Sequence, residues 1–208
     1  MGYPTLFVRL TGCPLRCRYC DTRYAFQGGR RMSLAEVLRA VRGITDPSGQ
    51  PRFVTVTGGE PLAQPACREL LALLCEAGYR VSLETGGALD ISGVDERVSI
   101  VMDIKTPGSG EMAANRPANL AALSHKDQVK FVICDRRDYE WARDRLAVSH
   151  IAARCEVLFL PVQGERESGQ PPADALAREL AEWILADRLP ARLQIPLHKY
   201  LWGDVRGK

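Results

Sequence analysis

The sequence predicts an α/β fold built on a parallel sheet that is either covered on both faces or curled into a barrel. Strand-like and helix-like segments alternate along the 208 residues, and most strand-like segments are apolar at consecutive positions. Strand candidates outnumber convincing helices, so we expect some connections to be loops. Unusual polar residues gather at the carboxyl ends of the strand candidates, the edge where parallel α/β folds place their sites.

The chain opens with a strand, a long loop and a helix. The first strand candidate is the apolar run Leu6–Leu10, and the loop after it extends through Gly29. A helix follows, because Ser33 and Glu36 form a capping box and apolar residues recur at helical spacing until Gly43.

The next segments repeat the strand and helix alternation. β-branched residues predict a strand at Phe53–Thr57, which leads directly into Gly58-Gly59-Glu60-Pro61. A helix from about Gln64 to Ala77 buries three leucines and stops at a glycine. The strand candidate Arg80–Glu84 comes next and ends in two glycines.

The second half of the chain continues this pattern around one irregular stretch, residues 107–127. Its strand candidates are Ser99–Asp103, Gln128–Ile133, Glu156–Leu160 and Leu193–Ile195. Its helix candidates are Asp138–Leu146 and Ala173–Asp187.

Composition predicts one globular domain over residues 1–208. The 28 Lys and Arg residues nearly balance 25 Asp and Glu residues, so no broad basic surface for nucleic acid is indicated. The longest apolar runs, such as Val157–Val162, are too short to cross a bilayer, and the first residues do not resemble a signal peptide. We therefore expect a cytoplasmic protein without membrane or nucleic-acid partners.

Three of the seven cysteines, Cys13, Cys17 and Cys20, lie on one short segment. Three thiolates can hold a soft metal centre, but a structural zinc site normally has four ligands and no fourth Cys or His is nearby. An iron–sulfur cluster held by three cysteines leaves one iron open to bind another molecule. The alternatives are a zinc site completed by a distant residue, or reactive thiols without metal. We expect the remaining four cysteines to be buried apolar residues.

The three-cysteine loop, with an aromatic residue before its last Cys, resembles that of the radical S-adenosylmethionine (SAM) enzymes. The Gly58-Gly59-Glu60-Pro61 turn is similar to the superfamily's motif for the methionine amino group. This resemblance implies a 4Fe–4S cluster on Cys13, Cys17 and Cys20. The open iron would anchor SAM, and one electron would cleave SAM to a 5′-deoxyadenosyl radical that takes a hydrogen atom from the substrate.

Further stretches along nearly the whole chain resemble the 7-carboxy-7-deazaguanine synthase family. They are residues 7–10, Cys20-Asp21-Thr22, 84–87, 103–111 and 197–202. The resemblance implies a partial, abbreviated TIM-like barrel of about six parallel strands with few helices. It also implies a homodimeric lyase of queuosine and 7-deazapurine biosynthesis, which converts 6-carboxy-5,6,7,8-tetrahydropterin to 7-carboxy-7-deazaguanine with loss of ammonia. SAM, Mg²⁺ and a flavodoxin-type electron donor would serve the reaction.

The same resemblance assigns roles to individual positions. Arg9 and Thr57 would bind the substrate, and Thr22 would bind Mg²⁺, because a hydroxyl is a hard oxygen donor. The residues that would line SAM are Tyr19, Cys20, Asp21, Gly58, Gly59, Glu60, Glu84, Asp103, Ile104, Lys105, Leu160, Pro161, Val162 and Gln163. Asp103 and Lys105 share one face of a strand, so a plain ion pair between them is the alternative. Glu84 could instead cap the adjacent loop.

His198 and Lys199 fit either a site role or a surface segment.

The sequence also departs from the family pattern in three places. Met1-Gly2-Tyr3-Pro4 stands where the family has already contributed a Gln-Gly-Glu-Gly segment with substrate contacts, so we expect an incomplete pterin site or a late start. Pro196 replaces a Gln and removes a backbone donor. Gly86 stands where Asn or Ser is commoner.

Two alternative functions stay open at this point. A glycyl-radical activating enzyme shares the cysteine spacing, although the match over residues 103–111 and at the C-terminus disfavours it. A non-catalytic iron–sulfur or zinc module is an alternative of a different class, which metal analysis and SAM binding would distinguish.

Overall fold

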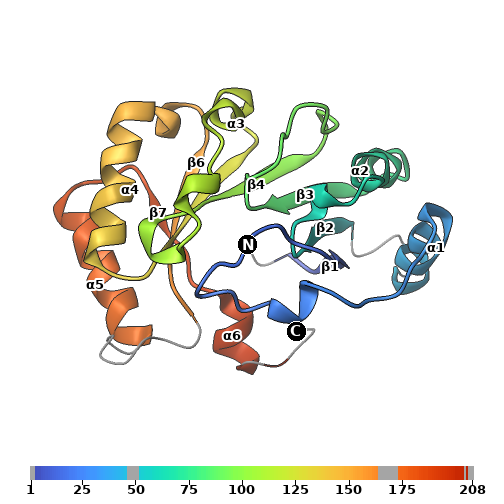
Figure 1. The fold of residues 1–208 in the computed structure, drawn as a ribbon, viewed down its shortest axis with the longest axis horizontal. Coiled ribbons are helices and arrows are strands. Elements are labelled where there is room, and N and C mark those ends of the chain that lie inside the picture. The colour runs from blue at the N-terminus through green and yellow to red at the C-terminus, as the bar shows by residue number, and fades with distance from the viewer. Residues whose placement is uncertain (1–2, 46–51, 164–172, 204, 206–208) are drawn as a thin grey trace.

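The computed structural model describes residues 3–45, 52–163, 173–203 and 205. Within these residues, seven parallel strands form one sheet in the chain order β1 to β7 (Figure 1). The strands are β1 Thr5–Leu10, β2 Phe53–Gly58, β3 Arg80–Thr85, β4 Ser99–Ile104, β5 Gln128–Ile133, β6 Glu156–Pro161 and β7 Arg192–Leu193. The first and last strands each pair with one neighbour, so the sheet is open, and six full strands and a two-residue seventh give the partial barrel that the sequence predicts.

The helices lie outside the curved sheet, except for the C-terminal one, which lies on the open side of the sheet (Figure 1). They are α1 Leu34–Ile44, α2 Cys67–Glu76, α3 Pro117–Ala122, α4 Arg136–Ser149, α5 Ala173–Ala186 and α6 Leu197–Trp202. Helices α1 and α2 cover the end of the sheet formed by the first strands, whereas α4 and α5 pack against β5 and β6. Short 3₁₀ turns occupy several of the remaining connections.

Alternation along the strands separates a core face from a polar face. On β4, Ile100, Met102 and Ile104 are buried in the main core with apolar residues of the outer helices. Val101 and Asp103 point to the opposite, inner face, because successive side chains of a strand alternate. The inner face therefore carries the polar residues of the strand ends.

Several boundaries differ from the expectations. Helix α2 begins at Cys67 rather than near Gln64, because a 3₁₀ turn at Pro61–Ala63 separates it from β2. Helix α4 begins at Arg136, two residues before the predicted start, because Asp135 is its N-cap and accepts a hydrogen bond from the Asp138 amide.

The structure also corrects the irregular parts. Pro117 at the first position opens α3 inside the stretch without a regular pattern. The last strand is Arg192–Leu193 rather than Leu193–Ile195, and the C-terminal segment forms α6. Helix α6 was missed because its six residues are too few to show a clear helical period.

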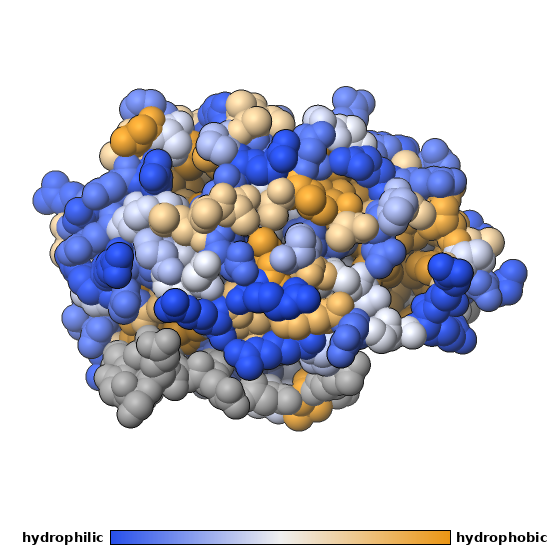
Figure 2. Space-filling model, viewed as in Figure 1, coloured by the Kyte–Doolittle hydropathy of each residue, from blue (hydrophilic) through white to orange (hydrophobic). Residues whose placement is uncertain are grey.

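The face of the molecule seen in Figure 1 is mixed in hydropathy, with hydrophilic residues spread among smaller apolar areas (Figure 2). In the part of the chain that the structure describes, no helix is both long and apolar enough to cross a membrane.

Candidate functional site

The three-cysteine loop follows β1 and is held against the turn after β2. The amides of Gly59 and Glu60 donate hydrogen bonds to the carbonyls of Leu10 (3.1 Å) and Gly12 (2.7 Å). A Cβ atom at Gly59 would overlap the Gly12 carbonyl, so only glycine permits this approach. The Gln64 side chain adds a 2.6 Å hydrogen bond to the Thr11 carbonyl. The two motifs found in the sequence thus form one packed unit at the carboxyl edge of the sheet.

The thiols of Cys13, Cys17 and Cys20 are all free and partly exposed. Burial is the main cause that raises the pKa of Cys13 and Cys17, and the Lys105 ammonium group opposes that rise at both. Among the described residues, no three His, Cys, Asp or Glu side chains converge on a position for one metal ion. A 4Fe–4S cluster takes one thiolate per iron, which the three cysteines of this loop can supply.

Glu60 is the centre of a buried hydrogen-bond network at the ends of β2 and β3. Its carboxylate accepts hydrogen bonds from the Thr85 hydroxyl (2.8 and 3.0 Å) and from the Gly86 (2.7 Å) and Leu62 (3.2 Å) amides. The residue is 1% exposed, and burial raises the pKa of its carboxyl group. Glu60 therefore braces two strand ends, whatever it contributes to a ligand.

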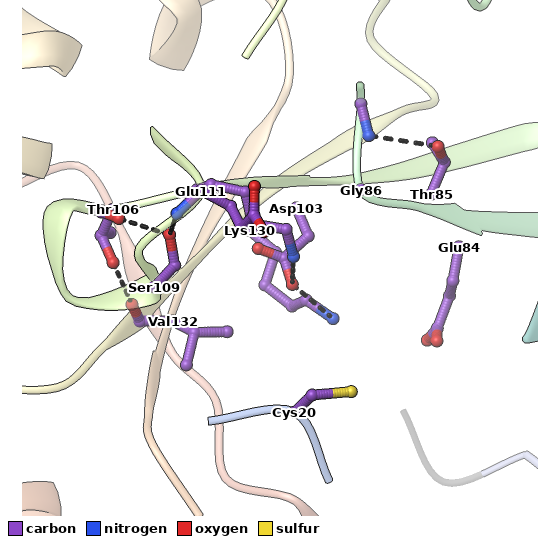
Figure 3. Close-up of polar contacts among 12 residues, drawn as sticks. Cys20, Glu84, Thr85, Gly86, Asp103, Thr106, Ser109, Glu111, Lys130 and Val132 are labelled. Carbon is purple, nitrogen blue, oxygen red and sulfur yellow. Dashed lines mark hydrogen bonds and ion pairs between the residues drawn. The ribbon is translucent and has the colours of Figure 1, made fainter. Parts of the chain in front are cut away.

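A row of polar residues crosses the inner face of the first three strands. Arg9 on β1 pairs in register with Thr57 on β2, and the Thr57 hydroxyl donates a 3.2 Å hydrogen bond to the Glu84 carboxylate on β3. Arg9 is exposed and its guanidinium lies 5.7 Å from the centre of the Tyr24 ring. The Glu84 carboxylate and the Cys20 thiol face the same region in Figure 3. Glu84 thus contacts a strand residue rather than capping the adjacent loop.

Asp103 lies between two lysines on the same face. Its Oδ2 atom is 3.2 Å from the Lys105 ammonium and 3.8 Å from the Lys130 ammonium (Figure 3). The ion pair suggested by the strand period is therefore present. The Oδ1 atom of Asp103 and the hydroxyl of Tyr19 are buried and have no hydrogen-bond partner among the described residues. Buried polar atoms are normally satisfied, so these two fit contacts with a polar ligand.

Thr22 closes the cysteine loop, and its hydroxyl lies 3.8 Å from the Cys20 sulfur. Asp21 beside it forms a 3.5 Å ion pair with Lys199 of α6, and the Lys199 ammonium also donates a 3.2 Å hydrogen bond to the Gln163 carbonyl. The C-terminal helix is thereby tied to both the cysteine loop and the end of β6. His198 is exposed.

Two other groups of predicted site residues have buried side chains. Ile104 is 7% exposed in the main core, so only its backbone is available at the inner face. Val162 packs in a second apolar cluster with Tyr19 and Leu160, and Pro161 is buried at the end of β6. These residues link the cysteine loop to the last long strands.

The structure brings most of the predicted residues to one edge of the sheet and adds some that the sequence reasoning missed. Thr85 is the hydroxyl partner of Glu60, and Lys130 is the second cation beside Asp103. Glu111 accepts a 2.6 Å hydrogen bond from the Arg16 amide inside the cysteine loop. Lys130 could have been predicted from the sequence. Its strand β5 ends at the same edge of the sheet, and the two-residue period of a strand places Lys130 on the polar inner face.

For two of the departures from the family pattern, Pro196 and Gly86, the structure shows the contacts around the substituted residue. Pro196 is the N-cap of α6 and its carbonyl accepts hydrogen bonds from the Lys199 and Tyr200 amides, so the absence of its own amide hydrogen costs nothing there. At Gly86, a Cβ atom would come within 3.3 Å of Glu60 and Leu15, a tight but limited contact. Met1 and Gly2 lie outside the described residues.

Comparison with known proteins gives the class first. The sequence signature of the Radical SAM superfamily matches residues 7–105, which contain the cysteine loop and the Gly58-Gly59-Glu60 turn. A crystal structure of Streptococcus suis SuiB bound to S-adenosylmethionine has the same fold, with a TM-score of 0.64 at 14% identity over 93% of this chain and 50% of that chain. The chain thus carries the Radical SAM signature on a fold that it shares with SuiB.

Curated relatives narrow the class to one family. The 7-carboxy-7-deazaguanine synthase of Chlorobaculum tepidum is 43% identical, over 99% of this chain and 89% of its own length. The synthases of Koribacter versatilis and Methanospirillum hungatei are 40% and 37% identical, over 97% and 96% of this chain and 89% and 78% of their own lengths. The chain belongs to the 7-carboxy-7-deazaguanine synthase family.

Proposed function

We propose that this chain converts 6-carboxy-5,6,7,8-tetrahydropterin to 7-carboxy-7-deazaguanine with loss of ammonia, a step of queuosine and 7-deazapurine biosynthesis. The observation that carries the proposal is the three-cysteine loop packed on the Gly58-Gly59-Glu60 turn in a chain of this family. Bound together, a 4Fe–4S cluster and SAM supply the radical that activates the substrate. The protein contributes ligands, orientation and the exclusion of water.

The cysteine loop would hold the cluster through Cys13, Cys17 and Cys20. Gly59 packs its backbone against Gly12 and Cys13, and the turn of Gly58, Gly59 and Glu60 would contact the SAM amino group beside the cluster. The unpartnered Asp103 Oδ1 and Tyr19 hydroxyl would contact polar atoms of SAM. Lys105, 7% exposed, holds Asp103 in place and offsets the negative charge of the thiolates.

In the polar row, Arg9 and Thr57 would bind the pterin, and Glu84 would contact SAM. An arginine matches a carboxylate in a bidentate geometry, and the substrate carries a carboxylate. Thr57 adds a hydroxyl suited to the amino and amide groups of a pterin ring, and its hydrogen bond to Glu84 joins the substrate side of the site to the SAM side.

The finer parts of the proposal concern Mg²⁺ and partners. Thr22 would supply one oxygen ligand to Mg²⁺, and substrate oxygens and water would complete the octahedron. We also propose that the chain acts as a homodimer in the cytoplasm, as one domain, and takes its electron from a flavodoxin-type donor.

Reductive cleavage of SAM tests the proposed class. The full chain, reconstituted anaerobically with iron and sulfide, should be brown, bind SAM and form 5′-deoxyadenosine when dithionite and the pterin are added. Cys17→Ala should lose the iron–sulfur absorbance and the cleavage, because three thiolates are needed to hold the cluster. Cys155→Ala, a change at a buried cysteine of the core, is the matched control. A full cluster on Cys17→Ala would contradict the ligand assignment.

A further inference from the structure

The turn after β4 forms a rigid block of buried hydrogen bonds. Thr106 and Ser109 are completely buried. The Ser109 hydroxyl donates a 2.6 Å hydrogen bond to the Thr106 carbonyl and accepts a 3.0 Å hydrogen bond from the Glu111 amide (Figure 3). The Thr106 hydroxyl reaches β5, where the Val132 carbonyl is a potential acceptor at 3.0 Å. The turn therefore presents Glu111 in a defined position.

Asp138 of α4 anchors this turn from behind. Its carboxylate is an acceptor for the Gly108 amide (2.8 Å), the Cys134 amide (3.1 Å) and the Thr106 hydroxyl (3.0 Å). A Cβ atom at Gly108 would lie 2.5 Å from the Asp138 carboxylate, so this position needs glycine. The turn is thus fixed to α4 and β5, both outside the proposed site.

The same turn also binds the cysteine loop, through one backbone amide on each side of Cys17. The Arg16 amide donates a 2.6 Å hydrogen bond to the Glu111 carboxylate, and the Arg18 amide donates a 3.0 Å hydrogen bond to the Ser109 carbonyl. The Arg16 guanidinium turns back to the Cys13 carbonyl at 2.7 Å and stacks on Phe26. The segment that carries Cys17 is therefore clamped by a turn that contains no cluster ligand.

We propose that Glu111 is a positioning residue that fixes the Cys17 segment and keeps the reduction potential of the cluster low. Amide hydrogens that point at a cluster sulfur, and nearby positive charge, raise the potential, whereas nearby negative charge lowers it. Glu111 binds the Arg16 amide hydrogen and places a carboxylate beside Cys17. Both effects favour a strongly reducing cluster, which one-electron cleavage of SAM requires.

The charges around Cys17 agree with this arrangement. The Glu111 carboxylate accepts a 2.6 Å hydrogen bond from the amide of Arg16, so its negative charge lies next to the residue before Cys17. The Lys105 ammonium, which is paired with Asp103, is the opposing positive group of the same site.

Hydrogen exchange in the metal-free full chain tests the clamp without the cluster. Glu111→Ala should accelerate exchange of the peptide that covers residues 13–20, because the Arg16 amide loses its acceptor. Glu111→Gln should leave the exchange nearly unchanged, since an amide oxygen can replace the carboxylate oxygen. Glu140→Gln, which removes a charge from the exposed side of α4, is the control. Unchanged exchange in Glu111→Ala would overturn the positioning role.

Redox titration of the reconstituted chain, followed by electron paramagnetic resonance, tests the electrostatic role. Glu111→Gln should raise the midpoint potential while iron content and hydrogen exchange match the wild type. Glu111→Ala should raise it further and lose iron to a chelator roughly 10–100-fold faster. If Glu111→Ala does not fold, Glu111→Gln alone decides, and a midpoint potential equal to that of Glu140→Gln would overturn the proposal. The inference rests on the proposed cluster, and a wild-type chain that assembles none would contradict that function, not the clamp seen by exchange.

Discussion

Glu60 shows at the residue scale how one carboxylate can organise a site. Three donor groups from two segments meet on it, and its side chain is completely surrounded by protein. A buried acceptor of this kind is costly to replace, because the donors it serves would be left unpaired. The carboxylate therefore ties the turn after β2 to the end of β3, where the polar row begins.

We predict that Glu60→Gln lowers the free energy of unfolding by about 1–3 kcal/mol. The amide nitrogen of Gln would face a donor that the carboxylate now satisfies, either the Thr85 hydroxyl or the Gly86 amide. Chemical denaturation measures the effect, and Glu76→Gln on the exposed side of α2 is the control. Equal stability of the two variants would mean that the buried network carries little energy.

Thr22 carries the prediction for Mg²⁺. Thr22→Ala should retain the iron–sulfur absorbance but require more Mg²⁺ for half-maximal turnover, because one oxygen ligand is lost. Thr22→Ser keeps the hydroxyl and should retain most of the Mg²⁺ response. The measurement is the rate of product formation against Mg²⁺ concentration, and identical curves for Thr22→Ala and the wild type would remove Thr22 from the metal site.

At the scale of elements, α6 acts as a strap across the cysteine loop. It is held by the Lys199 contacts to Asp21 and Gln163, while its apolar residues Tyr200, Leu201 and Trp202 stay exposed. A short helix with an exposed apolar face has little packing energy of its own. The ion pair and hydrogen bond of Lys199 are therefore important for where it lies.

We predict that Lys199→Met loosens α6. Hydrogen exchange of residues 197–202 should accelerate and SAM should bind more weakly, because the loop residue Asp21 loses its partner. Arg39→Met on the exposed side of α1 removes the same charge at a distance and is the control. Exchange of the α6 peptide at the wild-type rate would show that other contacts hold the helix.

How well each element could be predicted depends on which contacts stabilise it. The long strands and the capped helix α1 were predicted from sequence because their residues are buried at regular spacing or form the Ser33–Glu36 capping box that the structure contains. Helix α6 and the two-residue β7 depend on tertiary contacts, which leave no periodic signal. The Glu111 clamp was missed for the same reason, since it joins residues 95 positions apart.

At the scale of the whole molecule, the open parallel sheet explains why residues far apart in sequence form one site. Strands β1 to β6 all end at one edge, so each loop that follows a strand contributes to the same region. The first three strands supply the polar row, β4 supplies the Asp103 pair, and the turn after β4 holds the cysteine loop. Packing between the apolar outer face of the sheet and the helices holds the strand ends in place at this edge.

This arrangement also separates the competing functions. A non-catalytic zinc or iron–sulfur module would not account for the match to 7-carboxy-7-deazaguanine synthases over 99% of this chain. A glycyl-radical activating enzyme would share the cysteine loop, but the near full-length match to 7-carboxy-7-deazaguanine synthases speaks for a small pterin substrate.

The most direct measurement of the central claim is the identity of the product. The full chain, reconstituted with iron and sulfide and reduced under anaerobic conditions, is supplied with SAM, Mg²⁺ and 6-carboxytetrahydropterin and analysed by mass spectrometry. We predict 7-carboxy-7-deazaguanine, absent from a Cys17→Ala control. Formation of 5′-deoxyadenosine without 7-carboxy-7-deazaguanine would preserve the radical chemistry and contradict the substrate; formation of neither by a chain with a full cluster would contradict the function as a whole.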